Sequence, residues 1–74
     1  MKLSELKTGG TGTVTRVAGE ARFVSRVTSI GITKGCPIEV VQNAKKRPIL
    51  VFERDSLIAI SRKDCDLIDV EECR

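Results

Sequence analysis

Three short apolar runs follow one another in the second half of the chain, with only a few polar residues between them. The runs are Pro37–Asn43, Pro48–Phe52 and Leu57–Ile60. Connections this short join antiparallel neighbours, so the runs predict a three-stranded meander. The second and third runs are almost continuously apolar, which is typical of strands covered on both faces, and we expect Phe52 to lie in the core.

The side-chain inventory favours a mainly β fold. Val, Ile and Thr together number 21, against five Leu, and β-branched side chains suit strands better than helices. A cluster of glycines precedes Thr13–Val17 and Gly19 follows it, which predicts a first strand there. Its imperfect alternation allows a bulge. Leu67–Val70 predicts a last, short strand.

One segment has the apolar period of a helix. Phe23, Val27 and Ile30 follow one another at intervals of four and three residues, which places them on one face of a helix of about three turns over residues 20–30. We expect Phe23 to lie in the core. This is the one clear helix that the pattern predicts.

Two further signals mark helix ends. Gly31 fits the position where a left-handed residue ends a helix, and Ile32 after it can pack back on Val27, as in a Schellman motif. Ser61 can cap a short helical turn near residues 62–67, with Asp64 three residues further on.

The length of the chain limits what the fold can hold. With 74 residues, we expect one domain over residues 1–74. A domain of this size buries only about 60% of the surface of its unfolded chain, so it has little room for a large substrate pocket. No apolar run approaches the roughly 18 residues of a membrane helix, and the first residues lack the apolar stretch of a signal peptide. We therefore expect a soluble cytoplasmic protein.

Several side chains that carry chemistry are missing. The chain has no His, so the commonest general base is absent and the sequence argues against catalysis; we expect no catalytic residue and no cofactor. It has no Trp or Tyr for stacking nucleic-acid bases. Cys36, Cys65 and Cys73 form an odd set without a Cys-x-x-Cys pair, and we interpret them as reduced thiols, Cys65 in the core and Cys73 in a charged tail.

Charge is distributed unevenly along the chain. Residues 1–63 hold 12 basic and five acidic side chains, a net charge of +7, whereas residues 64–74 have a net charge of −4. A solvated surface is the simplest interpretation of these charges, and electrostatic steering toward an acidic partner is the functional one. The candidate partner-binding residues in the basic part are Arg22, Arg26, Lys34, Lys45, Lys46 and Arg47.

A spaced pattern of glycine and apolar residues runs through the chain. It reads Arg26-Val-x-x-Ile-Gly31-Ile-x-x-Gly35-x-Pro-Ile-x-Val40, then Pro48-Ile-Leu-Val-Phe and Leu57-Ile-Ala-Ile-Ser-Arg62. The chain opens with Leu3-Ser-Glu-Leu-x-x-Gly9 and closes with Cys65-Asp-Leu-Ile-Asp-Val70. Over this whole length it resembles the FeoA family, the small ferrous iron transport protein A. Val27 stands where the family has Leu, Cys65 where it usually has Ala, and the Ala44–Arg47 hairpin tip lacks a frequent Gly.

The resemblance implies an SH3-like small β-barrel and a non-catalytic accessory role in ferrous iron transport. We expect a cytoplasmic protein-interaction module that docks on the cytosolic, GTP-hydrolysing part of the ferrous iron permease and meets the membrane only through it. The candidate contacts are Arg22, Arg26 and Lys34 around the helix end, or Lys45, Lys46 and Arg47 on the hairpin tip.

Two alternatives stay open. A direct Fe2+ carrier or sensor could use Cys36, Cys65, Asp64 and Asp66 as thiolate and carboxylate ligands. A nucleic-acid-binding barrel would fit the basic part of the chain, but the missing aromatic residues and the acidic end argue against it.

Overall fold

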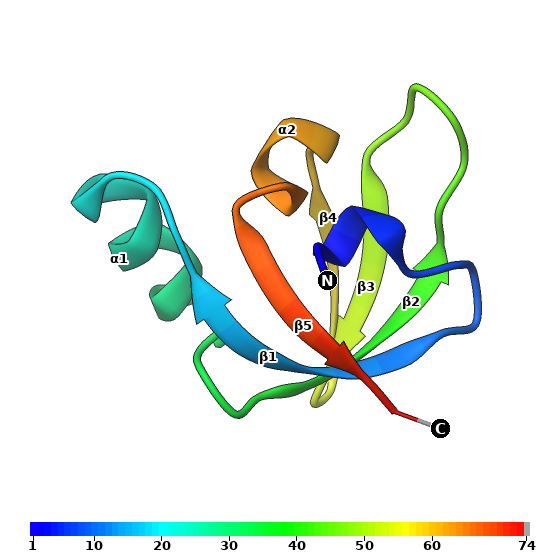
Figure 1. The fold of residues 1–74 in the computed structure, drawn as a ribbon, viewed down its shortest axis with the longest axis horizontal. Coiled ribbons are helices and arrows are strands. Elements are labelled where there is room, and N and C mark those ends of the chain that lie inside the picture. Colours follow the sequence, from blue (N-terminus) through cyan, green and yellow to red (C-terminus); the bar gives the residue numbers. More distant parts are fainter. Residues whose placement is uncertain (74) are drawn as a thin grey trace.

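Five antiparallel strands in the order β4-β3-β2-β1-β5 form the sheet of the computed structural model, which describes residues 1–73 (Figure 1). In chain order the elements are the 3₁₀ turn η1 (Leu3–Glu5), β1 (Thr11–Val17), α1 (Ala21–Ser29), β2 (Pro37–Gln42), β3 (Ile49–Glu53), β4 (Ser56–Ile60), α2 (Arg62–Cys65) and β5 (Ile68–Glu72). The mainly β fold, the β2–β3–β4 meander, the short helix and the helical turn are confirmed. The edge strands β4 and β5 do not pair with each other within residues 1–73, so strand pairing does not close the sheet into a full barrel.

Strand β1 is longer than the sequence predicts. It begins at Thr11 and therefore includes Gly12, which the sequence placed in the preceding turn. A Cβ atom on Gly12 would lie 3.0 Å from the Glu71 carbonyl oxygen, so the close approach of β5 explains the glycine. The bulge is confirmed, because the register between β1 and β5 shifts between Val14 and Arg16.

Helix α1 ends as the sequence predicts. Gly31 has a φ of 99°, the Ile32 amide donates to the Val27 carbonyl at 2.9 Å, and the Gly31 amide donates to the Thr28 carbonyl at 3.0 Å. These are the two hydrogen bonds of a Schellman motif. The helix itself is one residue shorter at each end than predicted, because Glu20 and Ile30 are its capping residues.

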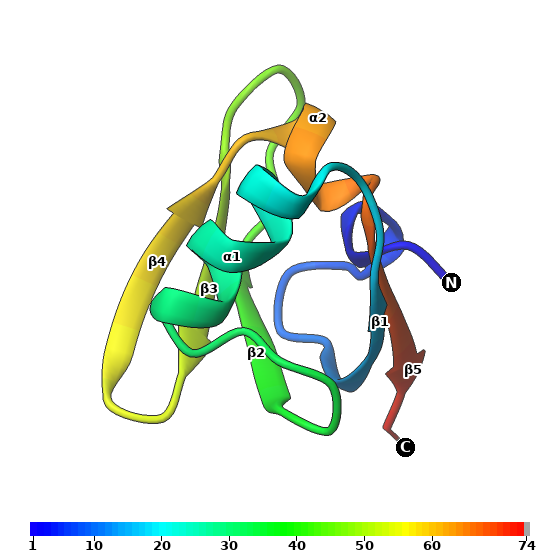
Figure 2. The same cartoon turned by 90° about the vertical axis from the view of Figure 1, so that its left-hand side faces the viewer.

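The core lies between the sheet and the buried face of α1. Its buried side chains are Leu3, Leu6, Val14, Phe23, Val27, Ile32, Cys36, Ile38, Val40, Ile49, Val51, Ile60, Cys65, Ile68 and Val70. The expectation that β3 and β4 are covered on both faces was wrong: Phe52 is 41% exposed and Leu57 is 61% exposed. Helix α1 lies over one face of the β2–β3–β4 part of the sheet (Figure 2). Phe52 alternates with the buried residues of β3 and Leu57 is its cross-strand partner, so both side chains belong to the other face. Ile30 is also exposed, at the end of α1.

The ends of the β2–β3 loop are tied to the rest of the fold. The Asn43 side-chain amide donates to the carbonyl oxygens of Ser4 at 3.1 Å and Leu6 at 2.6 Å.

The predicted cap of α2 is confirmed, since the Asp64 amide donates to the Ser61 hydroxyl at 3.2 Å. Neither helix of the described residues has the length and apolar character needed to cross a bilayer.

Lys46 occupies a backbone conformation that favours glycine, with a φ of 62°. We expect Lys46→Gly to raise the free energy of unfolding by about 0.5 to 1 kcal/mol. A side chain in the left-handed region costs roughly 1 to 2 kcal/mol, and glycine removes this cost. Part of the gain is offset, because glycine has more conformational freedom in the unfolded chain. Urea unfolding followed by far-UV circular dichroism measures the change. Lys45→Gly is the matched control one residue earlier and should not stabilise; equal effects of both would contradict the assignment.

Candidate functional site

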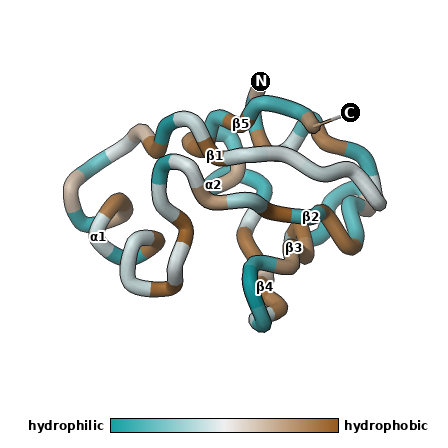
Figure 3. The backbone as a smooth tube through the Cα atoms, turned by 90° about the horizontal axis from the view of Figure 1, so that it is seen from below, coloured by the Kyte–Doolittle hydropathy of each residue, from teal (hydrophilic) through white to brown (hydrophobic). Residues whose placement is uncertain are grey.

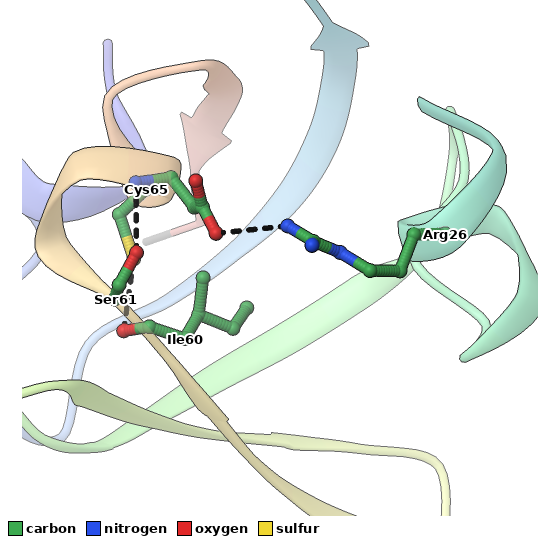
Figure 4. A network of polar contacts seen from close by, with 5 residues as sticks. Arg26, Ile60, Ser61 and Cys65 are labelled. Atoms are coloured by element: carbon green, nitrogen blue, oxygen red, sulfur yellow. Dashed lines mark hydrogen bonds and ion pairs between the residues drawn. The ribbon is translucent and has the colours of Figure 1, made fainter. Parts of the chain in front are cut away.

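The side chain of Arg26 reaches from helix α1 toward helix α2 (Figure 4). Arg26 Nη2 lies 3.1 Å from Asp64 Oδ2, so an ion pair joins the two helices. Two hollows of about 290 and 330 Å³ lie beside this pair, and both are lined by Arg26 and Asp64. We call these hollows together the α1–α2 groove.

The α1–α2 groove combines an apolar lining with charged side chains. The first hollow is lined by Gly19, Glu20, Arg22, Phe23, Arg26, Asp64 and Leu67, and the second by Arg26, Val27, Ile30, Ala59, Ile60, Ser61 and Asp64. The Arg26 guanidinium carbon lies 5.5 Å from the centre of the Phe23 ring, within the range of a cation–π contact. The ring and the carboxylate together hold Arg26 across the groove.

Helix α2 presents Asp64 to the groove because both of its ends are anchored. Its first turn is capped by Ser61, and the Cys65 thiol at its end donates to the Ile60 carbonyl at 3.7 Å (Figure 4). Cys65 is fully buried, as the sequence predicts, and this burial raises its pKa to about 12. The thiol is therefore a neutral part of the core at physiological pH.

The structure separates the predicted contact residues into three places. Arg22 and Arg26 both line the first hollow of the α1–α2 groove. Lys34 is exposed on the turn between α1 and β2 and lines neither hollow of the groove. The tip residues Lys45, Lys46 and Arg47 are exposed on the β2–β3 loop. Of the three candidates around the helix end, Arg22 and Arg26 thus lie on one surface, the α1–α2 groove, and Lys34 does not.

The β2–β3 loop is held by a residue that the sequence did not single out. Arg62 Nη1 donates to the carbonyl oxygens of Ala44 at 2.8 Å and Arg47 at 3.2 Å. The three basic side chains of the tip form no ion pair within residues 1–73. The loop therefore presents them on a fixed backbone. The only sign of this role in the sequence is that Arg62 is a basic residue directly after Ser61, the predicted cap of α2.

Glu53 is the charged residue that the described part of the chain buries, at 2% exposure. Its Oε1 lies 3.1 Å from Arg54 Nε and accepts a hydrogen bond from the Cys36 thiol at 3.3 Å. Burial, together with the Glu53 hydrogen bond and charge, raises the pKa of Cys36. The apolar run around Glu53 gave no sign of this pair.

The residues considered as Fe2+ ligands are not brought together. Cys36 contacts Glu53, whereas Cys65 contacts Ile60. Asp64 pairs with Arg26, and Asp66 accepts a hydrogen bond from the Ser4 hydroxyl at 2.6 Å. Residues 1–73 contain no group of three or more Cys, Asp or Glu side chains that could hold a metal ion.

Comparison with known proteins identifies relatives over nearly the whole chain. The profile of the FeoA domain matches residues 1–72. A fusion of Fe(2+) transport protein A with the Fe(2+) transporter FeoB, from Porphyromonas gingivalis, is 38% identical over 72 residues, which is 96% of this chain. The chain spans 8% of the length of that relative. These matches confirm the family resemblance.

Solved structures show the same architecture. The crystal structure of an iron uptake regulatory protein named FeoA aligns with a TM-score of 0.93 at 25% identity, over 99% of this chain and 97% of the other. The zinc complex of FeoA from Stenotrophomonas maltophilia, described as a procaryotic SH3 domain protein, aligns with a TM-score of 0.83 at 22% identity, over 96% and 89% of the two chains. The SH3-like fold is thereby confirmed.

Proposed function

Because this chain belongs to the FeoA domain family, we propose that it is a non-catalytic accessory protein of ferrous iron transport that docks on the cytosolic, GTP-hydrolysing part of a ferrous iron permease. The observation that carries this proposal is the fused relative from P. gingivalis, in which an equivalent domain and the transporter form one chain. A tether raises the effective concentration of two modules and reduces the affinity that each needs. The proposal therefore requires a surface of this domain that contacts the permease.

The α1–α2 groove is the surface that we assign to docking. Its two hollows are small and open, and Phe23, Val27, Ile30 and Leu67 contribute to their lining between charged side chains; of these four, Ile30 is exposed, at 44%. Such a surface suits a short segment with one or two apolar side chains. Arg22 is free of ion pairs within residues 1–73 and lies beside the first hollow, so an acidic residue of the segment would face it.

The β2–β3 loop supports the same proposal in a different way. Lys45, Lys46 and Arg47 are exposed on a backbone fixed by Arg62, and the chain carries a net charge of +3. Exposed charges of one sign raise the rate of encounter with an acidic partner more than they raise the affinity. We assign the loop to steering and the groove to contact.

A chemical-shift titration tests the proposal. The 15N-labelled full chain is titrated with the cytosolic GTPase domain of the permease from the same organism, and with Fe2+ alone under anaerobic conditions. We expect saturable shifts around Arg22, Phe23 and Leu67 with the domain. If Fe2+ alone shifts the signals around Cys36 and Cys65 and the GTPase domain shifts none, the docking proposal is wrong and a metal carrier is favoured instead.

Reversal of the charge at Arg22 should weaken docking. Arg22→Glu is expected to raise the dissociation constant about tenfold, because a close charge pair at an interface contributes on the order of 1.4 kcal/mol. Isothermal titration calorimetry measures the constant. Lys34→Glu is the matched control, since it reverses an exposed basic residue outside the groove. An equal loss in both variants would show that net charge, and not the α1–α2 groove, determines the affinity.

A further inference from the structure

The two edges of the sheet differ in how they are protected. At one edge, β5 carries Asp69, Glu71 and Glu72, and the N-terminal residues lie against it. The Met1 ammonium donates to the Val70 carbonyl at 3.0 Å, and the Val70 amide donates to the Met1 carbonyl at 2.7 Å. Charged side chains and covering backbone are the usual means by which proteins prevent pairing at a sheet edge.

The opposite edge, β4, has neither form of protection. Its five residues, Ser-Leu-Ile-Ala-Ile, include no charged residue and no proline. It pairs with β3 on one side, and within residues 1–73 no strand or bridge pairs with it on the other. Alternate backbone amides and carbonyls of an antiparallel edge strand point away from the sheet. The edge strand β4 is therefore a template for another strand.

The outer face beside this edge is apolar. Phe52 and Leu57 are direct cross-strand partners on β3 and β4, and they are 41% and 61% exposed. Leu50 and Ala59 form the next pair on the same face. Figure 3 shows the hydrophobic stretches along β2, β3 and β4. An extra strand beside β4 would extend this apolar surface.

The charges that flank β4 show which strand fits there. Before β4, Arg54 pairs with Glu53, and Asp55 is exposed and free of ion pairs within residues 1–73. After β4, Asp64 pairs with Arg26, and Lys63 is likewise exposed and without an ion pair there. Arg62, next to Lys63, is occupied by the carbonyl oxygens of Ala44 and Arg47. The strand thus has an exposed, unpaired negative charge before it in Asp55 and an exposed, unpaired positive charge after it in Lys63.

We propose that this edge binds a second copy of the chain, with the two β4 strands paired antiparallel about a two-fold axis. A two-fold axis brings the beginning of each β4 next to the end of the other, so Asp55 of each copy faces the end that carries Lys63 of the other. Pairing centred on Ile58 places Leu57 of one copy opposite Ala59 of the second, a large side chain beside a small one. Charge and shape are both self-complementary.

Analytical ultracentrifugation of the full chain tests this dimer. The contact is small, so we expect a dissociation constant between about 10 µM and 1 mM, with the mass rising from 8.1 kDa toward twice that value with concentration. Leu57→Lys should raise the constant at least tenfold. Val41→Lys is the control: it is 42% exposed on β2, away from the edge, and should change the constant less than twofold. A wild-type chain that stays monomeric over this range would overturn the proposal, as would equal effects of the two variants.

Charge reversal gives a second, independent readout. Asp55→Lys and Lys63→Asp should each weaken the dimer several-fold, whereas the double variant should restore the wild-type constant, because the free charges are only exchanged. Circular dichroism checks that every variant is folded. Failure of the double variant to restore dimerisation, with folding intact, would overturn the antiparallel arrangement.

Discussion

Replacing Gly31 with alanine is expected to destabilise the domain by about 3 kcal/mol, from roughly 1 to 2 kcal/mol for a side chain in a left-handed backbone and about 1 to 2 kcal/mol for overpacking. The backbone at Gly31 has a φ of 99°, and an added Cβ would lie 2.7 Å from Glu53 Oε2. That carboxylate cannot move away freely, because Cys36 and Arg54 both hold its other oxygen. Both the end of α1 and the position of the buried Glu53 carboxylate therefore require a glycine at position 31.

The matched control is Gly35→Ala, since Gly35 has a φ of 91° and nothing within 4 Å of its Cβ position. It should cost only the backbone part, about 1 to 2 kcal/mol. Urea unfolding is followed by far-UV circular dichroism, because the chain has no Trp or Tyr to report by fluorescence. A double-mutant cycle with Glu53→Ala should show coupling of about 1 kcal/mol or more. Equal losses at Gly31 and Gly35 would mean that Glu53 yields without cost.

The fold was predictable where the signals are local. The end of α1 follows from Gly31 and Ile32, and the cap of α2 follows from Ser61, because each feature involves residues within a few positions of one another. The meander follows from the short connections between its apolar runs. Strand and helix ends differ from the structure by one or two residues, where competing local signals overlap.

Exposure was harder to predict, because it depends on which elements cover which face. An apolar run such as Pro48–Phe52 reads the same whether its second face is covered or open. In the structure α1 covers one face only, so Phe52 and Leu57 are exposed together. The same sequence therefore gives a strand with one buried face and an apolar edge.

The candidate site was predictable only in parts. The spacing of Arg22 and Arg26 places them on one polar face of α1, and the structure puts both in the α1–α2 groove. The partner of Arg26 is Asp64, 38 residues away, and no sequence signal links the two. Lys34 follows the helix closely in sequence, but the chain has turned toward β2 by that point, so it lies outside the groove.

The stability of the domain should fall at alkaline pH, and Cys65 should account for a large part of the fall. Burial raises the pKa of its thiol from 9.0 to about 12 in the folded protein. Between these values the unfolded chain loses the thiol proton while the folded chain keeps it, so rising pH favours unfolding. The stability that the neutral thiol contributes is complete below pH 9 and is lost at about 1.4 kcal/mol per pH unit above it.

Cys65→Ala isolates this contribution, because it removes the thiol and leaves a small apolar side chain in the core. Urea unfolding between about pH 7 and 10.5 should show wild type losing up to about 2 kcal/mol more than the variant. The buried thiol of Cys36, whose pKa is also raised, is present in both proteins. It therefore contributes equally to both pH profiles and not to the difference between them. Cys73→Ala, at an exposed thiol, controls for the removal of a thiol as such. Parallel pH profiles for wild type and Cys65→Ala would show that the thiol ionises in place, and that α2 gives water access to the core without unfolding.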